Sequence, residues 1–172
     1  GTSNLIIEFA YRNNDTDPYT QFYGDLMTDF NSAAVVLGKD GCIEFGGGSD
    51  KLLLPDNALN DIKDEITIAF WAYGDPKSQP QDASIFEGIN NKGQRVLNIH
   101  APWSNGNIYW DAGSDNNGGY DRIEKNASTQ NYEGQWNHWA FVKNTATGKM
   151  EIYLNGTLWH SGTNKKLTME GI

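Results

Sequence analysis

Short runs of apolar, β-branched and aromatic residues recur along almost the whole chain, and this recurrence limits the fold more than any other feature. Segments rich in glycine and asparagine separate the runs, such as GGGSD, NNKG and SDNNGG. Glycine and asparagine accept the positive φ angles of tight turns, so each run is predicted to be a strand that ends at a turn. The predicted strands are LIIEFAY (5–11), AAVVLG (33–38), GCIEFG (41–46), KLLLP (51–55), ITIAFWAYG (66–74), ASIFEG (83–88), RVLNIH (95–100), NIYWDA (107–112), WAFVK (139–143) and MEIYLN (150–155).

This spacing predicts an all-β fold, an antiparallel β-sandwich, over a single domain spanning residues 1–172. The length of 172 residues suits one domain with a substantial core, and the chain has no repeat or break in composition. Its 19 glycines agree with many turns. Only DNALNDIKDE (56–65) suggests a helical turn.

The charge of the chain excludes two classes of partner. Thirteen basic and 22 acidic residues give a net charge of −9, which would repel nucleic acid and anionic membranes. No apolar run approaches the length needed to cross a membrane, so we expect no membrane insertion. Cys42 is the only cysteine, so no internal disulfide forms, and we expect it to be a small buried hydrophobic residue.

The segment from 134 to 162 is predicted to contain a β-hairpin. In MEIYLN, apolar and polar residues alternate, and NTATGK before it is a turn composition. Trp136 and Trp139 are three residues apart, so they point to opposite faces of an extended chain and cannot form one stacking platform. We expect Trp136 to be a buried packing anchor. Period-two spacing predicts one shared core face, formed by Ile66, Ile68, Phe70, Ile152 and Leu154.

Four segments in this order resemble a known family. WNHWAFVKN followed by GKMEIYLNG is similar to the hairpin of the laminin G-like, pentraxin-like branch of the concanavalin A-like lectin/glucanase superfamily. CIEFGGGSDKLLLP, ITIAFWAYG and SIFEGINNKGQRVLNI resemble its preceding strands. The resemblance spans residues 33 to 160. It implies a jelly-roll sandwich, and the fold serves lectins, adhesion modules and glycosidases alike.

The resemblance carries two further expectations. Members continue with strands beyond the equivalent of LTMEGI, so we expect a domain truncated at its C-terminus, lacking its last strands. An exposed strand edge would then be open to self-association. The family context also implies a secreted or cell-surface protein.

The sequence offers little support for an enzyme. Retaining glycosidases need two carboxyl groups about 5 Å apart on one face, and the Glu-x-Asp-x-x-Glu strand of the superfamily's glucanases is absent. We interpret Asp61, Asp64 and Glu65 as solvated charges. No nucleophile motif or phosphate loop is found. His138 is expected to be a packing residue, and the histidine spacing does not suggest zinc.

The most informative segment is the polar, aromatic stretch from 101 to 126. Sugars bind by stacking their C–H faces on aromatic rings while amides, carboxylates and arginine bind the hydroxyls. We therefore predict a carbohydrate site here; its residues would be Trp103, Asn107, Trp110, Asp111, Tyr120 and Arg122. The alternative stays open that Tyr109 and Trp110 lie on opposite faces of one strand, one of them in the core, and that the polar residues only form turns.

A calcium ion would have three candidate positions. The run from Gly113 to Glu124 partly matches an EF-hand loop, with Asp115 and Asp121 among its matching positions. Its first residue is glycine and no helices flank it, so an EF-hand is rejected, while a looser oxygen-rich calcium site stays open. Family relatives suggest Asn90 with Asn91, and the turn at Asp50.

The sequence therefore predicts a non-catalytic, lectin-like module that binds a polysaccharide or other glycan. The main alternative is a structural or protein-interaction domain without a sugar site. A relative of the polysaccharide-active glycosidases comes third.

Overall fold

The computed structural model describes residues 6–8, 36–37, 43–45, 51, 53–54 and 58–172. They belong to two compact units, one made of Gly1–Phe9 with Asp61–Ile172 and the other of Ala10–Asn60. Within the second unit, the strands β2 (Val36–Leu37) and β3 (Ile43–Glu44) pair antiparallel. The first unit holds the other strands and every site discussed below.

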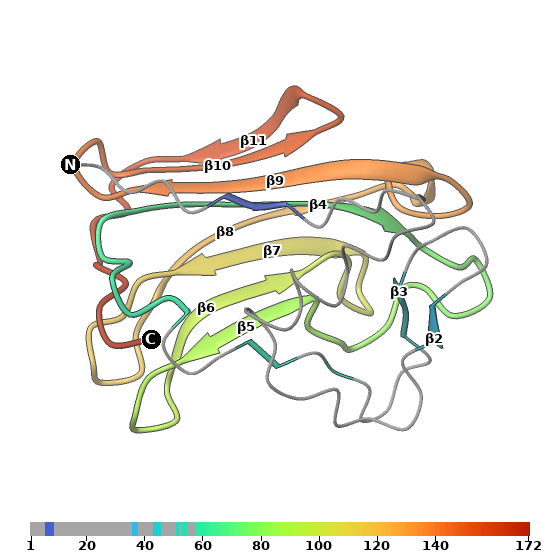
Figure 1. The fold of residues 1–172 in the computed structure, drawn as a ribbon. Helices are drawn as coiled ribbons and strands as arrows, with labels where there is room; N and C mark the ends of the chain where they lie inside the picture. The colour runs from blue at the N-terminus through green and yellow to red at the C-terminus, as the bar shows by residue number, and fades with distance from the viewer. Residues whose placement is uncertain (1–5, 9–35, 38–42, 46–50, 52, 55–57) are drawn as a thin grey trace. The chain divides into compact units, whose positions relative to one another are not determined.

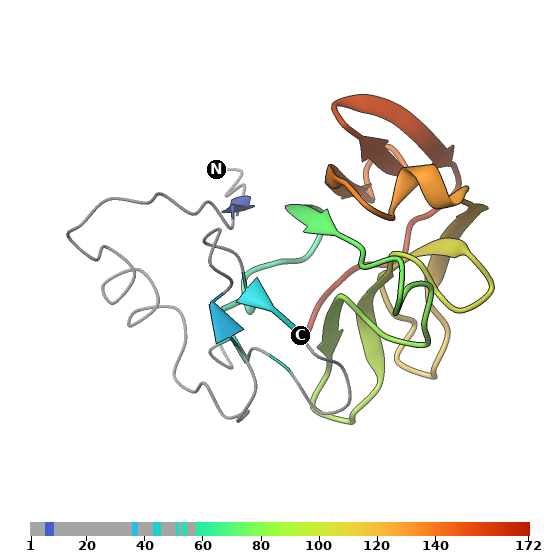
Figure 2. The ribbon, with the colours of Figure 1, turned by 90° about the vertical axis from the view of Figure 1, so that its right-hand side faces the viewer.

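The first unit consists of two β-sheets, as Figure 1 shows. One sheet has the strand order β1-β4-β9-β10-β11, and the other has the order β5-β6-β7-β8. The view turned by 90° (Figure 2) shows the same two layers. The strands of the five-stranded sheet are β1 (Ile6–Glu8), β4 (Glu65–Tyr73), β9 (Trp136–Asn144), β10 (Lys149–Leu154) and β11 (Thr157–Gly162). Those of the four-stranded sheet are β5 (Phe86–Ile89), β6 (Arg95–His100), β7 (Asn107–Ala112) and β8 (Asp121–Asn126).

The predicted all-β sandwich is confirmed, and most of the predicted strands lie close to where the pattern placed them. One pairing differs from a purely antiparallel arrangement, because β1 runs parallel to β4 with Ile7 opposite Ile68. Among the described residues the only helix is the 3₁₀ turn Thr129–Asn131. The expected helical turn in DNALNDIKDE is wrong for residues 58–65, which form turns and then enter β4.

The core lies between the inward faces of the two sheets. The four residues Ile66, Ile68, Phe70 and Ile152 are buried as predicted, whereas Leu154 is half-buried near the end of its strand. The Trp110 ring packs edge-on against Phe141 at 5.8 Å, and its Nε1 donates to the carbonyl of Val142 at 3.1 Å. Burial of large side chains from both sheets is the main force that holds the layers together.

The hairpin predicted within the segment from 134 to 162 forms between β9 and β10. The turn after Asn144 is fixed by the Asn144 side chain, whose Oδ1 accepts the Thr147 amide, and by Gly148 at φ 66°. Asn155 and Gly156 form the next tight turn with φ angles of 50° and 78°, the geometry that hairpins with two-residue loops favour.

The prediction that Trp136 is a buried packing anchor is wrong, since its side chain is 47% exposed. β9 begins at Trp136, so this residue shares the outward face with His138, opposite to the buried Trp139. Across the strands, Trp136 lies opposite Tyr73, and their ring centroids are 5.8 Å apart. Trp71 is 59% exposed on the same face. This face therefore carries an exposed aromatic cluster.

Candidate functional site

The candidate site lies on the four-stranded sheet, on the side that faces away from the five-stranded sheet. We call this side the polar face. Alternation along each strand sends apolar residues inward and polar residues outward. On the inner side, Ile108, Trp110 and Ala112 of β7 are fully buried. The outward residues are Asn98 and His100 of β6, Asn107, Tyr109 and Asp111 of β7, and Arg122, Glu124 and Asn126 of β8.

Strand register brings the outward residues into rows. Asp111 lies opposite Asn98 on one side and Arg122 on the other. In the next row, Tyr109 lies between His100 and Glu124. Because paired strands lie less than 5 Å apart, each row places its side chains within contact of one another.

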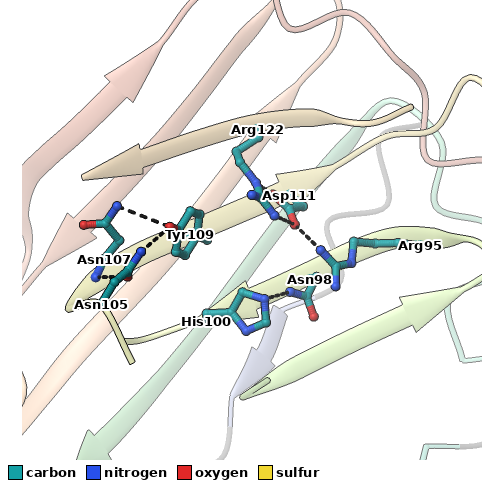
Figure 3. Close-up of polar contacts among 8 residues, drawn as sticks. All are labelled: Arg95, Asn98, His100, Asn105, Asn107, Tyr109, Asp111 and Arg122. Atoms are coloured by element: carbon teal, nitrogen blue, oxygen red, sulfur yellow. Dashed lines mark hydrogen bonds and ion pairs between the residues drawn. The ribbon is translucent and has the colours of Figure 1, made fainter. Parts of the chain in front are cut away.

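A charged cluster occupies the first row, and Figure 3 shows its three members meeting. Arg122 donates from Nε and Nη2 to the two oxygens of Asp111, at 2.6 and 2.8 Å. Arg95 donates from Nη1 to Asp111 Oδ2 at 2.9 Å. The hydrogen bond with Asp111 raises the pKa of Arg122, against the opposing effect of burial. Asp111 is fully buried beneath the two guanidinium groups.

Two tyrosines stack on these arginines. The guanidinium carbon of Arg122 lies 4.6 Å from the ring centroid of Tyr109 and 5.1 Å from that of Tyr120. Arg95 lies over the same Tyr120 ring at 5.5 Å. Cation–π stacking of this kind fixes the orientation of each guanidinium plane.

Two amides contact the Tyr109 hydroxyl at the other end of the polar face (Figure 3), and a third amide contacts one of them. Asn105 Nδ2 donates to this hydroxyl at 2.8 Å, and Asn107 Nδ2 does so at 3.3 Å. Asn126 donates to Asn107 Oδ1 at 2.9 Å. Amides that both donate and accept are suited to hydroxyl-rich ligands.

His100 is held in one neutral form by its neighbours. Its pKa is lowered, mainly by burial and then by the positive charges of Arg95 and Arg122. The neutral ring fits contacts in which Nδ1 donates to the Ala83 carbonyl and Nε2 accepts from Asn98 Nδ2, at 2.9 and 2.7 Å. Asn98 Oδ1 is buried with no hydrogen-bond partner among the described residues.

The fold should lose stability on mild acidification because of His100. An unfolded histidine takes up a proton near pH 6.5, whereas folded His100 resists protonation to lower pH, so acid favours the unfolded state. In urea titrations at about pH 7.5 and 5.5, His100→Gln is expected to show a smaller loss of unfolding free energy than the parent protein. His160→Gln is measured for comparison. Burial lowers the pKa of His160 as well, so this variant should also show a smaller loss of unfolding free energy than the parent protein. An identical pH dependence in the parent and His100→Gln would contradict this assignment.

The structure assembles only part of the sugar site predicted from the sequence. Asn107, Asp111 and Arg122 share the polar face, and Tyr120 stacks on the arginine. Trp103 is half-buried beside the polar face, and its ring centroid lies 4.3 Å from that of His100. The assignment of Trp110 to the sugar site is wrong, because this residue is fully buried in the core and cannot stack on a ligand.

The predicted site also left out other members of the polar face, namely Arg95, Asn98, His100, Tyr109, Glu124 and Asn126. For Tyr109 the signal was available: Asn107, Tyr109 and Asp111 share one parity, so the strand that exposes the two polar residues must expose the tyrosine and bury Trp110. His100 could not be placed without the pairing of β6 with β7, and strand parity would assign Arg95 to the buried side with Leu97 and Ile99.

Two of the calcium candidates are held by other partners. Asp121 turns inward and pairs with Lys143, while Asn90 Oδ1 accepts two amides of its own turn, from Lys92 and Gln94. Asp115 accepts the amides of Asn117 and Gly119, which lower its pKa. Within the described part of the chain, no three acidic, histidine or cysteine side chains converge on a metal position. The candidate at Asp50 and the lone Cys42 lie outside the described residues.

Comparison with protein families shows to which family this chain belongs. A family model described as the concanavalin A-like lectin/glucanases superfamily matches residues 46–170, which is most of the chain. This chain belongs to the concanavalin A-like lectin/glucanases superfamily. The resemblance seen in its sequence is thereby confirmed, and the two-sheet sandwich is the fold expected of that superfamily. A search of curated proteins gives no match.

Proposed function

We propose that this concanavalin A-like domain is a non-catalytic carbohydrate-binding module, and that a glycan lies across its polar face. The observation that carries the proposal is the gathering of two tyrosine rings, two guanidinium groups and three amides on one side of one sheet. Rings offer stacking surfaces to the C–H faces of sugars, and the polar groups offer hydrogen bonds to hydroxyls.

The absence of catalysis is part of this proposal. Asp111, the central carboxylate of the polar face, is bound by two guanidinium groups, so its oxygens are not free for nucleophilic or acid–base work on a sugar. Glu124 and Glu87 are exposed on the flanking strands β8 and β5. Neither forms a hydrogen bond or ion pair with another described residue that would orient it for catalysis.

We further propose that the module acts outside the cell or at its surface, where polysaccharides are encountered. The described residues contain no helix that is long and apolar enough to span a membrane. The net charge of −9 argues against nucleic acid as a partner.

A protein-interaction role is the second candidate, and one specific observation favours it. The exposed aromatic cluster of Trp71, Tyr73 and Trp136 lies on the other sheet, and exposed tryptophan and tyrosine are enriched at protein interfaces. This face is distinct from the polar face, so substitutions can separate the two roles.

Affinity electrophoresis through gels that contain soluble polysaccharides tests the proposal. Tyr120→Ala and Trp103→Ala are expected to weaken retardation about tenfold, since a stacked ring contributes about 1–1.5 kcal/mol. Tyr73→Ala, on the other sheet, is the matched control and should bind like the parent. Parallel gels with EDTA test for a required cation. If only Tyr73→Ala loses binding, the glycan binds the five-stranded sheet and the proposal is wrong.

A further inference from the structure

The charge balance of the polar face bears on which glycans it can accept. Two guanidinium groups share one carboxylate, so the trio of Arg95, Asp111 and Arg122 carries one excess positive charge. Arg122 alone binds both oxygens of Asp111 and would neutralise it. The charge of Arg95 is therefore not needed to neutralise Asp111, although the chain as a whole has a net charge of −9.

Both guanidinium groups have N–H donors that no described residue accepts. Each group carries five N–H bonds, and within the described part of the chain three of the ten point to Asp111. The arginine side chains are 30% and 31% exposed, whereas the Asp111 side chain is fully buried. A ligand that approaches the polar face therefore meets N–H donors before it meets the carboxylate.

These donors are held in place before any ligand arrives. Tyr109 and Tyr120 flank the Arg122 guanidinium, and Tyr120 also supports Arg95. Because stacking already restricts both side chains, little conformational entropy remains to be lost when they bind an anion. Rigid, forked donors of this kind match the paired oxygens of a carboxylate or sulfate.

The other acidic residues of the same sheet face do not form ion pairs with the two arginines in the described structure. Glu124 lies opposite Tyr109, and Glu87 lies opposite Asn98; both are exposed. They moderate the local field across solvent, and they do not occupy the arginine donors.

From these observations we infer that the polar face selects acidic glycans, with a sugar carboxylate or sulfate ester accepting N–H bonds from Arg95 and Arg122. The inference rests on the proposed carbohydrate-binding function. The sugar ring then lies against Tyr120, while its acidic group faces the two arginines.

Matched polymers provide the test. Polygalacturonate and its fully methyl-esterified form share one backbone and differ in charge, and dextran sulfate and dextran form a second pair. In affinity gels, the parent protein is expected to bind at least one acidic polymer about tenfold or more tightly than its neutral counterpart. The preferred pair distinguishes a carboxylate from a sulfate ligand. Increasing salt should weaken binding to the acidic polymer and leave binding to the neutral one unchanged.

Arg95→Gln is the informative variant because Arg122 remains to neutralise Asp111. It is expected to lose the preference for the acidic polymer, whereas Arg95→Lys should retain part of it. Lys125→Gln removes the same charge from a side chain that lies over Trp159, and it should bind like the parent. Glu124→Gln should bind the acidic polymer more tightly. Thermal unfolding checks that each variant is folded.

The outcomes separate the inference from the proposed function. Equal binding of acidic and neutral polymers would overturn the inference and leave the carbohydrate-binding function intact. An equal loss in Lys125→Gln and Arg95→Gln would also overturn it, because attraction would then depend on overall charge. If no polymer of either pair is retarded, the inference and the proposed function both fail.

Discussion

Alanine at Trp110 is expected to lower the free energy of unfolding by about 3–5 kcal/mol, the usual cost of removing a large buried aromatic. The ring is fully buried, packs against Phe141 of the opposite sheet, and donates its only N–H to the Val142 carbonyl. The substitution therefore removes a contact between the layers and leaves the Val142 carbonyl without this donor. Urea unfolding of the purified variant measures the loss.

Trp136→Ala is the matched control for this prediction. The same side chain is removed, but Trp136 is 47% exposed and its ring meets Tyr73 at the surface. We expect a cost of about 1 kcal/mol or less, as for a surface aromatic pair. Comparable losses for Trp110 and Trp136 would contradict the assignment of the two rings to core and surface.

The second large effect is expected at Asp121, the partner of a lysine buried in the sandwich. Lys143 is 1% exposed, and its Nζ lies 2.6 Å from Asp121 Oδ2 and 3.3 Å from the Ala112 carbonyl. Burial lowers the pKa of Lys143, while the hydrogen bond to Asp121 opposes this effect. Asp121 Oδ2 also accepts the amide of Leu167, which ties the C-terminal segment to β8.

Asp121→Ala should therefore cost about 3–5 kcal/mol, because it leaves an unpaired charge in the interior. The double variant Asp121→Ala with Lys143→Met removes the charge as well, and it should recover a large part of this loss. Urea unfolding of the single and double variants completes the cycle. A double variant no more stable than Asp121→Ala would show that the ion pair is not the source of the effect.

Strands that carry a clear apolar pattern were predictable from the sequence. RVLNIH and NIYWDA coincide with β6 and β7, and ITIAFWAYG lies within one residue of β4 at each end. β8 was missed because DRIEKN has one apolar residue, Ile123, to indicate its buried side. β11 was missed because TLWHSG lies beyond the Asn155–Gly156 turn and does not alternate.

The polar face was predicted only in part, for a physical reason. Residues of one strand can be assigned to a face by parity, and parity correctly groups Asn107 with Asp111. Arg95 shares its parity with the buried Leu97 and Ile99, and it reaches Asp111 beside a shift in the register between β5 and β6, which local sequence does not specify. The ion cluster that forms the centre of the site is therefore a product of topology.

If a glycan lies on the polar face, its binding will shift the amide signals of that face, which chemical-shift mapping measures. An ¹⁵N-labelled sample would be titrated with a short oligosaccharide cut from the polymer that the gels select. We predict shifts that cluster at Tyr109, Asp111, Tyr120 and Arg122. Shifts confined to Trp71, Tyr73 and Trp136 would contradict the account and assign binding to the five-stranded sheet.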